Sequence, residues 1–153
     1  MAEAASNRTV KNTKSGGKIV SRVNKDGKTV VRRKRADGTT KAVTRTNAEG
    51  KAVKRTKNAD GTTAAVKRGT VTRKKNADGK TKSVTRKNAA GQKVTRRKGS
   101  AGKTRAVTRT NANGTKVRNN KITGTKTKVK TNKNGRKVTV KVAADGTKTK
   151  TKE

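Results

Sequence analysis

Valine and arginine recur two residues apart along much of this chain, in a Val-x-Arg signature. Residues two apart in a β-strand point to the same face, so the pattern predicts strands on which valine and arginine share one cationic face. The signature occurs at Val43/Arg45, Val53/Arg55, Val66/Arg68, Val71/Arg73, Val84/Arg86, Val94/Arg96 and Val107/Arg109. We expect the opposite face to be flat and to carry mostly small side chains: Ala42, Thr44, Thr46, Ala52, Thr56, Ser83, Thr85, Thr95, Ala106 and Thr108. The valines show no 3.6-residue period, so helices are not expected.

The stretch Asn58-Ala59-Asp60-Gly61-Thr62 predicts the reversal that separates successive strands. It suits a type I turn followed by a G1 bulge, in which Asn can bond the backbone two residues on. Gly then adopts the left-handed conformation without a Cβ clash. Related stretches occur at residues 24–27, 35–38, 47–50, 76–79, 88–91, 111–114, 132–135 and 143–146. The usual spacing of about 10–12 residues is that of one short strand plus one turn.

A longer period lies behind this spacing. The next valine falls alternately five and three residues after the turn glycine, which gives a unit of about 22–23 residues with two strands. The interval from Gly61 to Gly79 is shorter, and Arg68-Gly69 stands there in place of a turn. We therefore predict an all-β, elongated antiparallel meander, single-layer or thinly packed. Two alternatives are a two-strand-per-coil β-solenoid and a chain that is disordered when free.

Two segments differ in pattern. Residues 1–17 lack the repeat and are predicted to form a flexible N-terminal arm, whereas residues 18–153 form the β-repeat region, with about six two-strand units. A Lys- and Thr-rich hairpin repeat of this period, with Ala-Asp-Gly-Thr at its turns, resembles the free-standing single-layer sheet of spirochaete outer-surface lipoproteins. Those proteins balance Lys with Glu and carry a lipid-anchored N-terminal Cys, and this chain does neither. The resemblance implies an architecture and no function.

Composition limits how such a chain can be stabilised. The sequence has no Leu, Phe, Tyr, Trp, Pro or Cys, and its large aliphatic residues are Val, Ile19, Ile122 and Met1. Burying a valine contributes about 1.5 kcal/mol, while ordering each residue costs about 1–2 kcal/mol. We therefore expect the free chain to be poorly folded at low salt and to gain strand content with a polyanion.

Charge narrows the choice of partner. Lys and Arg number 46 against 8 Asp and Glu, which leaves a net charge of +38. Six of the acidic residues directly precede a turn glycine, so the strands are left purely cationic. One carboxylate per turn is too few for a calcium loop, and no His, Cys or Tyr is available for acid–base or nucleophilic catalysis. We expect no enzymatic activity, cofactor, metal or small-molecule substrate.

These features predict a non-enzymatic structural protein that binds a polyanion through Arg45, Arg55, Arg68, Arg73, Arg86, Arg96 and Arg109. Nucleic acid in a virion or nucleoid is the favoured partner. It would be bound without sequence specificity, because no helix is expected for a groove and no aromatic can stack on bases. The alternative is a minor capsid, cement or scaffold protein on an acidic protein surface of a larger assembly.

An anionic membrane is a less favoured partner, because the strands show no apolar face to insert. No apolar run resembles a membrane span or a secretion signal. We therefore expect an intracellular, nucleoid-associated or virion-borne protein.

Overall fold

The computed structural model describes residues 7–153, which contain strands and turns and no helix. The chain divides into two units, one ending at Gly79 and one beginning at Lys80. The first contains β1 (Asn7–Asn12), β2 (Lys18–Val23), β3 (Thr29–Lys34), β4 (Thr40–Thr46), β5 (Ala52–Lys57), β6 (Thr63–Arg68) and β7 (Val71–Lys75). The second contains β8 (Thr81–Lys87), β9 (Lys93–Lys98), β10 (Thr104–Thr110), β11 (Lys116–Asn120), β12 (Lys126–Thr131), β13 (Lys137–Val142) and β14 (Lys148–Lys152).

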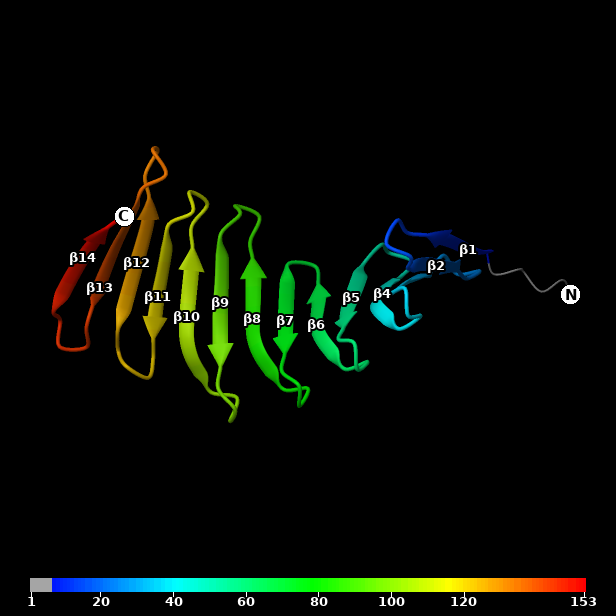
Figure 1. Ribbon diagram of the computed structural model, residues 1–153, viewed down its shortest axis with the longest axis horizontal. Coiled ribbons are helices and arrows are strands. Elements are labelled where there is room, and N and C mark those ends of the chain that lie inside the picture. Colours follow the sequence, from blue (N-terminus) through cyan, green and yellow to red (C-terminus); the bar gives the residue numbers. More distant parts are fainter. Residues whose placement is uncertain (1–6) are drawn as a thin grey trace, which may run out of the picture. The chain divides into compact units, whose positions relative to one another are not determined.

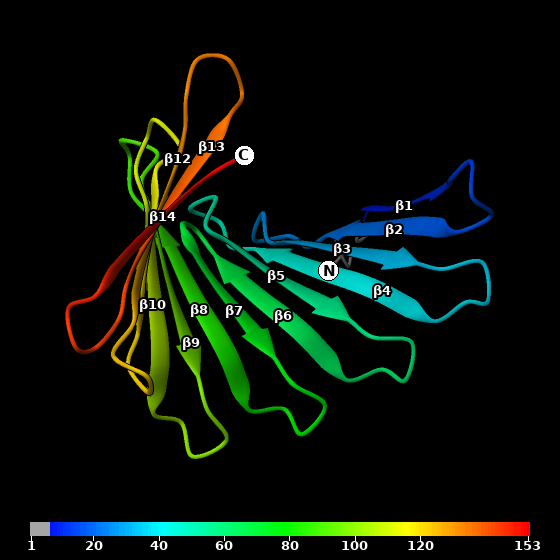
Figure 2. The ribbon, with the colours of Figure 1, turned by 60° about the vertical axis from the view of Figure 1, so that its left-hand side comes forward.

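Each unit is a single-layer antiparallel meander, as predicted. Within each unit every strand pairs with its neighbours in the sequence, and no described strand packs on the face of another. The order is visible for β8–β14 in Figure 1 and for β3–β7 in Figure 2. A two-strand coil would instead stack each strand on the one two positions along the chain. The solenoid alternative is therefore wrong for both units.

The predicted turn forms between β5 and β6. The amide of Gly61 donates to the carbonyl of Asn58 at 3.2 Å, and the amide of Asn58 donates to the carbonyl of Thr62 at 2.9 Å. Gly61 has a φ of +84°, the left-handed conformation that a side chain disfavours. These bonds confirm the type I turn with its G1 bulge. The same bond pattern recurs at most of the other predicted turns.

The amide of the fifth turn residue has two kinds of partner. Where that residue is Lys, Gln or Arg, the amide donates to the side-chain oxygen of the first residue, as in Lys51 to Asn47 at 2.8 Å. Where it is Thr, the amide donates to the third residue, as in Thr62 to Asp60 at 2.9 Å. Both arrangements satisfy a backbone donor that the bulge leaves outside the ladder. Asp37, Asp60 and Asp145 therefore have a local structural role as acceptors within their turns.

The short interval in the repeat is a two-residue turn. Arg68 pairs directly with Val71, so Gly69 and Thr70 alone connect β6 to β7. Gly69 has a φ of +50° and Thr70 does not have a positive φ. This combination is that of a type II′ turn, in which Gly is needed at the first central position. The interval is thus a shortened connection within a continuous hairpin.

The β-repeat begins earlier than the glycine pattern indicates. Residues 7–12, which we assigned to the flexible arm 1–17, form β1 and pair with β2 from Asn7↔Val23 to Asn12↔Lys18. The sequence signal is weak because the β1–β2 turn contains Thr13 rather than Asn or Asp at its first position. Residues 1–6 of the predicted arm lie outside the described residues.

Neither unit has an apolar core of ordinary size. Among the described residues, the buried apolar side chains are Ala42 and Ala106, with 5% and 3% of their surface exposed. One reinforcing contact comes from Arg35, whose guanidinium donates to the carbonyls of Thr40 at 3.2 Å and Lys57 at 2.8 Å. Backbone pairing and turn geometry therefore carry most of the order. No helix within residues 7–153 is long and apolar enough to cross a membrane.

Candidate functional site

The predicted arginines lie on one face in each unit. In the first unit, Arg45, Arg55, Arg68 and Arg73 point to the same side of β4–β7, and in the second unit Arg86, Arg96 and Arg109 share one side of β8–β10. The face shared by valine and arginine is called the Arg/Val face below. Each unit thus gathers its own set of these arginines on a common face, as the two-residue spacing within the strands predicted.

Cross-strand register arranges the Arg/Val face of the first unit as two alternating rows. One row runs across β2–β7 as Arg22, Val30, Arg45, Val53, Arg68 and Val71. The neighbouring row runs Val20, Arg32, Val43, Arg55, Val66 and Arg73. Each arginine therefore lies opposite valines. Because strands are about 4.8 Å apart, arginines within a row repeat about every 9.6 Å.

The second unit continues the alternation with a change of cation. Its first row runs Arg86, Val94, Arg109, Val117, Lys128, Val140 and Lys150. Its second row runs Val84, Arg96, Val107, Asn119, Lys126, Val142 and Lys148. Arginine thus gives way to lysine from β12 onward. Lysine presents a hydrated point charge in place of a planar fork, so the two regions differ in how they can hold an anion.

The guanidinium groups of the seven predicted arginines have no hydrogen bond or ion pair within the part of the chain that the structure describes. All seven are exposed, whereas the valines beside them are half-buried. The arginine stems are therefore placed to cover valine while the charged heads face solvent. The described strands contain no acidic residue. Each guanidinium group is left with its donor fork available to an external anion.

Acidic side chains are confined to the turns and the chain end among the described residues. The two ion pairs found there, Lys28–Asp26 at 3.7 Å and Lys51–Glu49 at 2.8 Å, are each internal to one turn. In the Thr-containing turns, the Thr62 hydroxyl and amide donate to Asp60 and hold the pKa of that carboxyl below its ordinary value. No three potential metal ligands cluster within residues 7–153.

The opposite face carries the predicted small residues, with more charge than expected. Cross-strand pairs such as Ala42↔Thr56 and Thr85↔Thr95 lie on it, and the latter two hydroxyls are 3.0 Å apart. Cations are interspersed among them, including Lys11, Arg33, Lys54, Lys67, Lys74, Arg97 and Arg118. The prediction of a flat face of small side chains is therefore correct for the small residues and incomplete for the charge.

Sequence reasoning missed three arginines of the Arg/Val face. Arg22 and Arg32 belong to copies of the same signature, beginning at Val20 and Val30, so the signal was present. Arg8 lies directly opposite Arg22, and its strand carries the signature in reverse order, with arginine before valine. The lysines of β12 and β14 were also missed, because there valine and cation lie on different strands.

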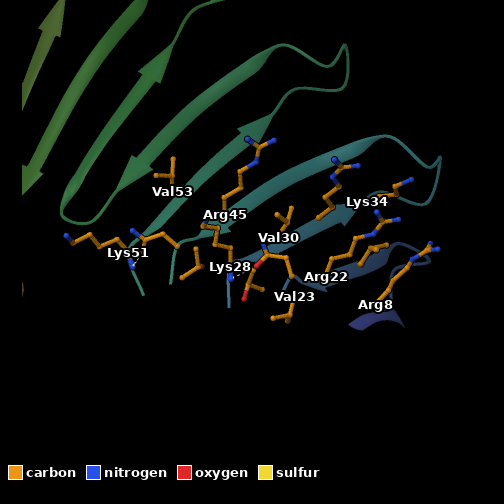
Figure 3. Close-up of a pocket in the computed structure, with 15 residues that line it drawn as sticks. Arg8, Arg22, Val23, Lys28, Val30, Lys34, Arg45, Lys51 and Val53 are labelled. Carbon is orange, nitrogen blue, oxygen red and sulfur yellow. Dashed lines mark hydrogen bonds between the residues drawn. The ribbon is translucent and has the colours of Figure 1, made fainter. Parts of the chain in front are cut away.

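The first unit also contains a concavity of about 830 Å³ on this face. Its cationic lining residues are Arg8, Arg22, Lys28, Arg32, Lys34, Arg45 and Lys51, and no carboxylate lines it. Figure 3 shows Arg8, Arg22 and Arg45 extending from the same side of β1, β2 and β4. Most of the remaining lining residues are valines and turn polar residues.

Comparison with known proteins adds little to this description. No protein-family model matches the sequence. Curated proteins include none with detectable similarity. Among solved structures, the G-box domain of the microcephaly protein CPAP aligns over 95% of this chain and 98% of its own, with 16% identity and a TM-score of 0.32. A TM-score this low supports no inference about function.

Proposed function

We propose that this chain is a non-enzymatic structural protein whose Arg/Val face binds a polyanion, with nucleic acid as the favoured partner. The binding groups are Arg45, Arg55, Arg68 and Arg73 in the first unit and Arg86, Arg96 and Arg109 in the second. Binding would be independent of sequence, as for a component that lies against packaged nucleic acid in a virion or nucleoid.

The regular rows of unpartnered guanidinium groups carry this proposal. A solvated sheet face needs no excess of one sign, and a structural arginine would be expected to contact a backbone carbonyl, as Arg35 does with Lys57. A guanidinium group binds phosphate or carboxylate through two parallel hydrogen bonds. Phosphates recur regularly along a nucleic acid, and arginines recur regularly along a row, so one strand of nucleic acid could contact several arginines. Alternation with valine keeps neighbouring arginines off directly opposite positions, which lowers the repulsion within the sheet.

The way that the chain could read nucleic acid is limited. It has no aromatic residue to stack on an exposed base, and its described residues offer no helix to a major groove. Contact with the phosphate backbone, driven by counterion release, is what remains. We therefore favour duplex nucleic acid over a single strand with splayed bases.

Two variants of equal charge test the proposal. The first replaces the seven arginines named above with glutamine. The second replaces seven of the cations of the opposite face, Lys11, Arg33, Lys54, Lys67, Lys74, Arg97 and Arg118, with glutamine. Binding to a DNA duplex is measured over a salt series. If all seven arginines contact phosphate, the log–log salt slope of the first variant falls in magnitude by about 6, since each contact contributes about 0.9.

The second variant should keep most of the parent's slope, and an equal loss in both variants would contradict the assignment to one face. A third variant with lysine at the same seven positions keeps the charge. It should retain the slope and bind more weakly, because lysine lacks the planar fork. Tight binding to an acidic polypeptide, with none to duplex DNA or RNA, would replace nucleic acid by an acidic protein surface as the partner.

A further inference from the structure

On the Arg/Val face of the first unit, the concavity contains the one pair of arginines that lie directly opposite each other, and Lys18↔Lys34 is a further opposed pair of cations on that face. Arg8 and Arg22 lie directly opposite each other on β1 and β2, where the register elsewhere places valine opposite arginine. Like charges at directly opposite positions destabilise a strand pair. Neither guanidinium group has a hydrogen bond or ion pair among the described residues. The repulsion is therefore uncompensated in the absence of an external anion.

Other cations converge on the same place. Arg32, Lys34 and Arg45 line the concavity without ion-pair partners, whereas the lining lysines Lys28 and Lys51 are paired with turn carboxylates. Five unneutralised cations thus face a volume of about 830 Å³. That volume lies within the range of small-molecule sites, about 300–1,000 Å³. The half-buried valines Val20, Val30 and Val53 also line the concavity, between these cations.

We propose that this concavity, which shares Arg45 with the polyanion-binding set, binds a compact, multiply charged phosphate compound, with Arg8 and Arg22 as its central clamp. The ligand class is a small scaffold carrying several phosphoryl groups, and no base is required, because no aromatic residue lines the site. This goes beyond the binding of a long polyanion, since it needs only the first unit and only a small ligand. Bound phosphate would offset the repulsion between the two opposed guanidinium groups.

Tripolyphosphate is a suitable probe, and its binding can be measured by calorimetry. The measurement is made at about 0.15 M salt, because salt at this concentration screens attraction between exposed charges beyond about 8 Å. We expect one tripolyphosphate per chain. Arg8→Gln with Arg22→Gln should weaken binding by about tenfold or more, because hydrogen bonds to charged groups contribute more than neutral ones. The matched control is Lys54→Gln with Lys67→Gln, which removes two exposed and directly opposed lysines from the other face of the same unit, outside the concavity. It should change the affinity by less than about twofold.

The outcomes separate this inference from the proposed function. Equal weakening in the two double variants, or several equivalent tripolyphosphate sites per chain, would show diffuse attraction and overturn the inference. No tripolyphosphate binding, with intact duplex binding, would overturn the inference and leave the proposed function standing. To guard against a folding defect, Arg8→Lys with Arg22→Lys keeps both charges and should retain part of the tripolyphosphate affinity. If the lysine variant loses as much affinity as the glutamine variant at unchanged strand content, binding depends on the planar guanidinium groups of Arg8 and Arg22 and not on their charge alone.

Discussion

Exchanging Val43 and Arg45 within β4 breaks the alternating rows while leaving the composition and net charge unchanged. In Val43→Arg with Arg45→Val, the new guanidinium group lies directly opposite Arg32 on one side and Arg55 on the other. A favourable cross-strand pair contributes about 0.2–1 kcal/mol, and like charges directly opposite are destabilising on a similar scale. Two such contacts should therefore lower the free energy of unfolding by about 0.4–2 kcal/mol.

The chain offers a control with the opposite sign. Arg8→Val with Val10→Arg is the same kind of exchange on β1, where the parent has Arg8 opposite Arg22 and Val10 opposite Val20. The exchange restores the alternation and removes one opposed pair of arginines. Its free energy of unfolding should rise by about 0.2–1 kcal/mol.

Thermal unfolding followed by circular dichroism, at about 0.1 M and about 1 M salt, measures both effects. Screening shortens from about 10 Å to about 3 Å over this range, so both differences from the parent should shrink at high salt. If both exchanges shift stability in the same direction, or if the differences are independent of salt, the account of the alternating rows is wrong.

Three further predictions concern the turns. The Thr62 hydroxyl and amide lower the pKa of Asp60 in the folded chain. The stability that Asp60 contributes is therefore present above the pKa it has in the unfolded chain, and it is lost as the pH falls through the pKa it has in the folded chain. Asp60→Asn should make the free energy of unfolding less dependent on pH below about pH 4. Arg35→Gln removes the bond to the Lys57 carbonyl and should lower the free energy of unfolding by about 1.5 kcal/mol or more, measured by thermal unfolding. Gly69→Ala places a side chain at φ +50° and should cost about 1–2 kcal/mol in the same assay, with a smaller loss for Gly69→Asn.

Each of these has a contradicting result. If the acid unfolding transition of Asp60→Asn is the same as that of the parent, the hydrogen bonds from Thr62 to Asp60 do not contribute to the stability of the fold. Arg35→Gln with parent stability would show that the contact with Lys57 is energetically neutral. Equal stability of the parent and Gly69→Ala would show that the β6–β7 turn relaxes without loss of pairing.

The turns were the most predictable part of the structure, because their chemistry is local. Asn58, Asp60 and Gly61 each have a preferred backbone role that needs no distant contact. Glycine spacing then determined the strand lengths and the order of the meander. The start of β1 was less predictable, since its pairing depends on β2 and its turn lacks an acidic residue or Asn at the first position.

The candidate site was predictable within a strand and not between strands. Two-residue periodicity placed Val43 and Arg45 on one face, but only the register shows that Arg45 lies opposite Val30 and Val53. The same limit explains the lysines of β12 and β14, which join the face through pairing with β13. A concavity depends on the twist of several strands together, so no local pattern indicates it.

Circular dichroism at low salt, with and without duplex DNA, tests the central claim most directly. That claim is that a highly basic sheet, whose buried apolar residues among residues 7–153 are two alanines, requires an external anion to offset its charge. We expect strand content to be low in the absence of DNA and to rise when duplex DNA is added, because the phosphates neutralise the cationic face. Full strand content and cooperative melting in low-salt buffer, with nothing bound, would contradict the claim.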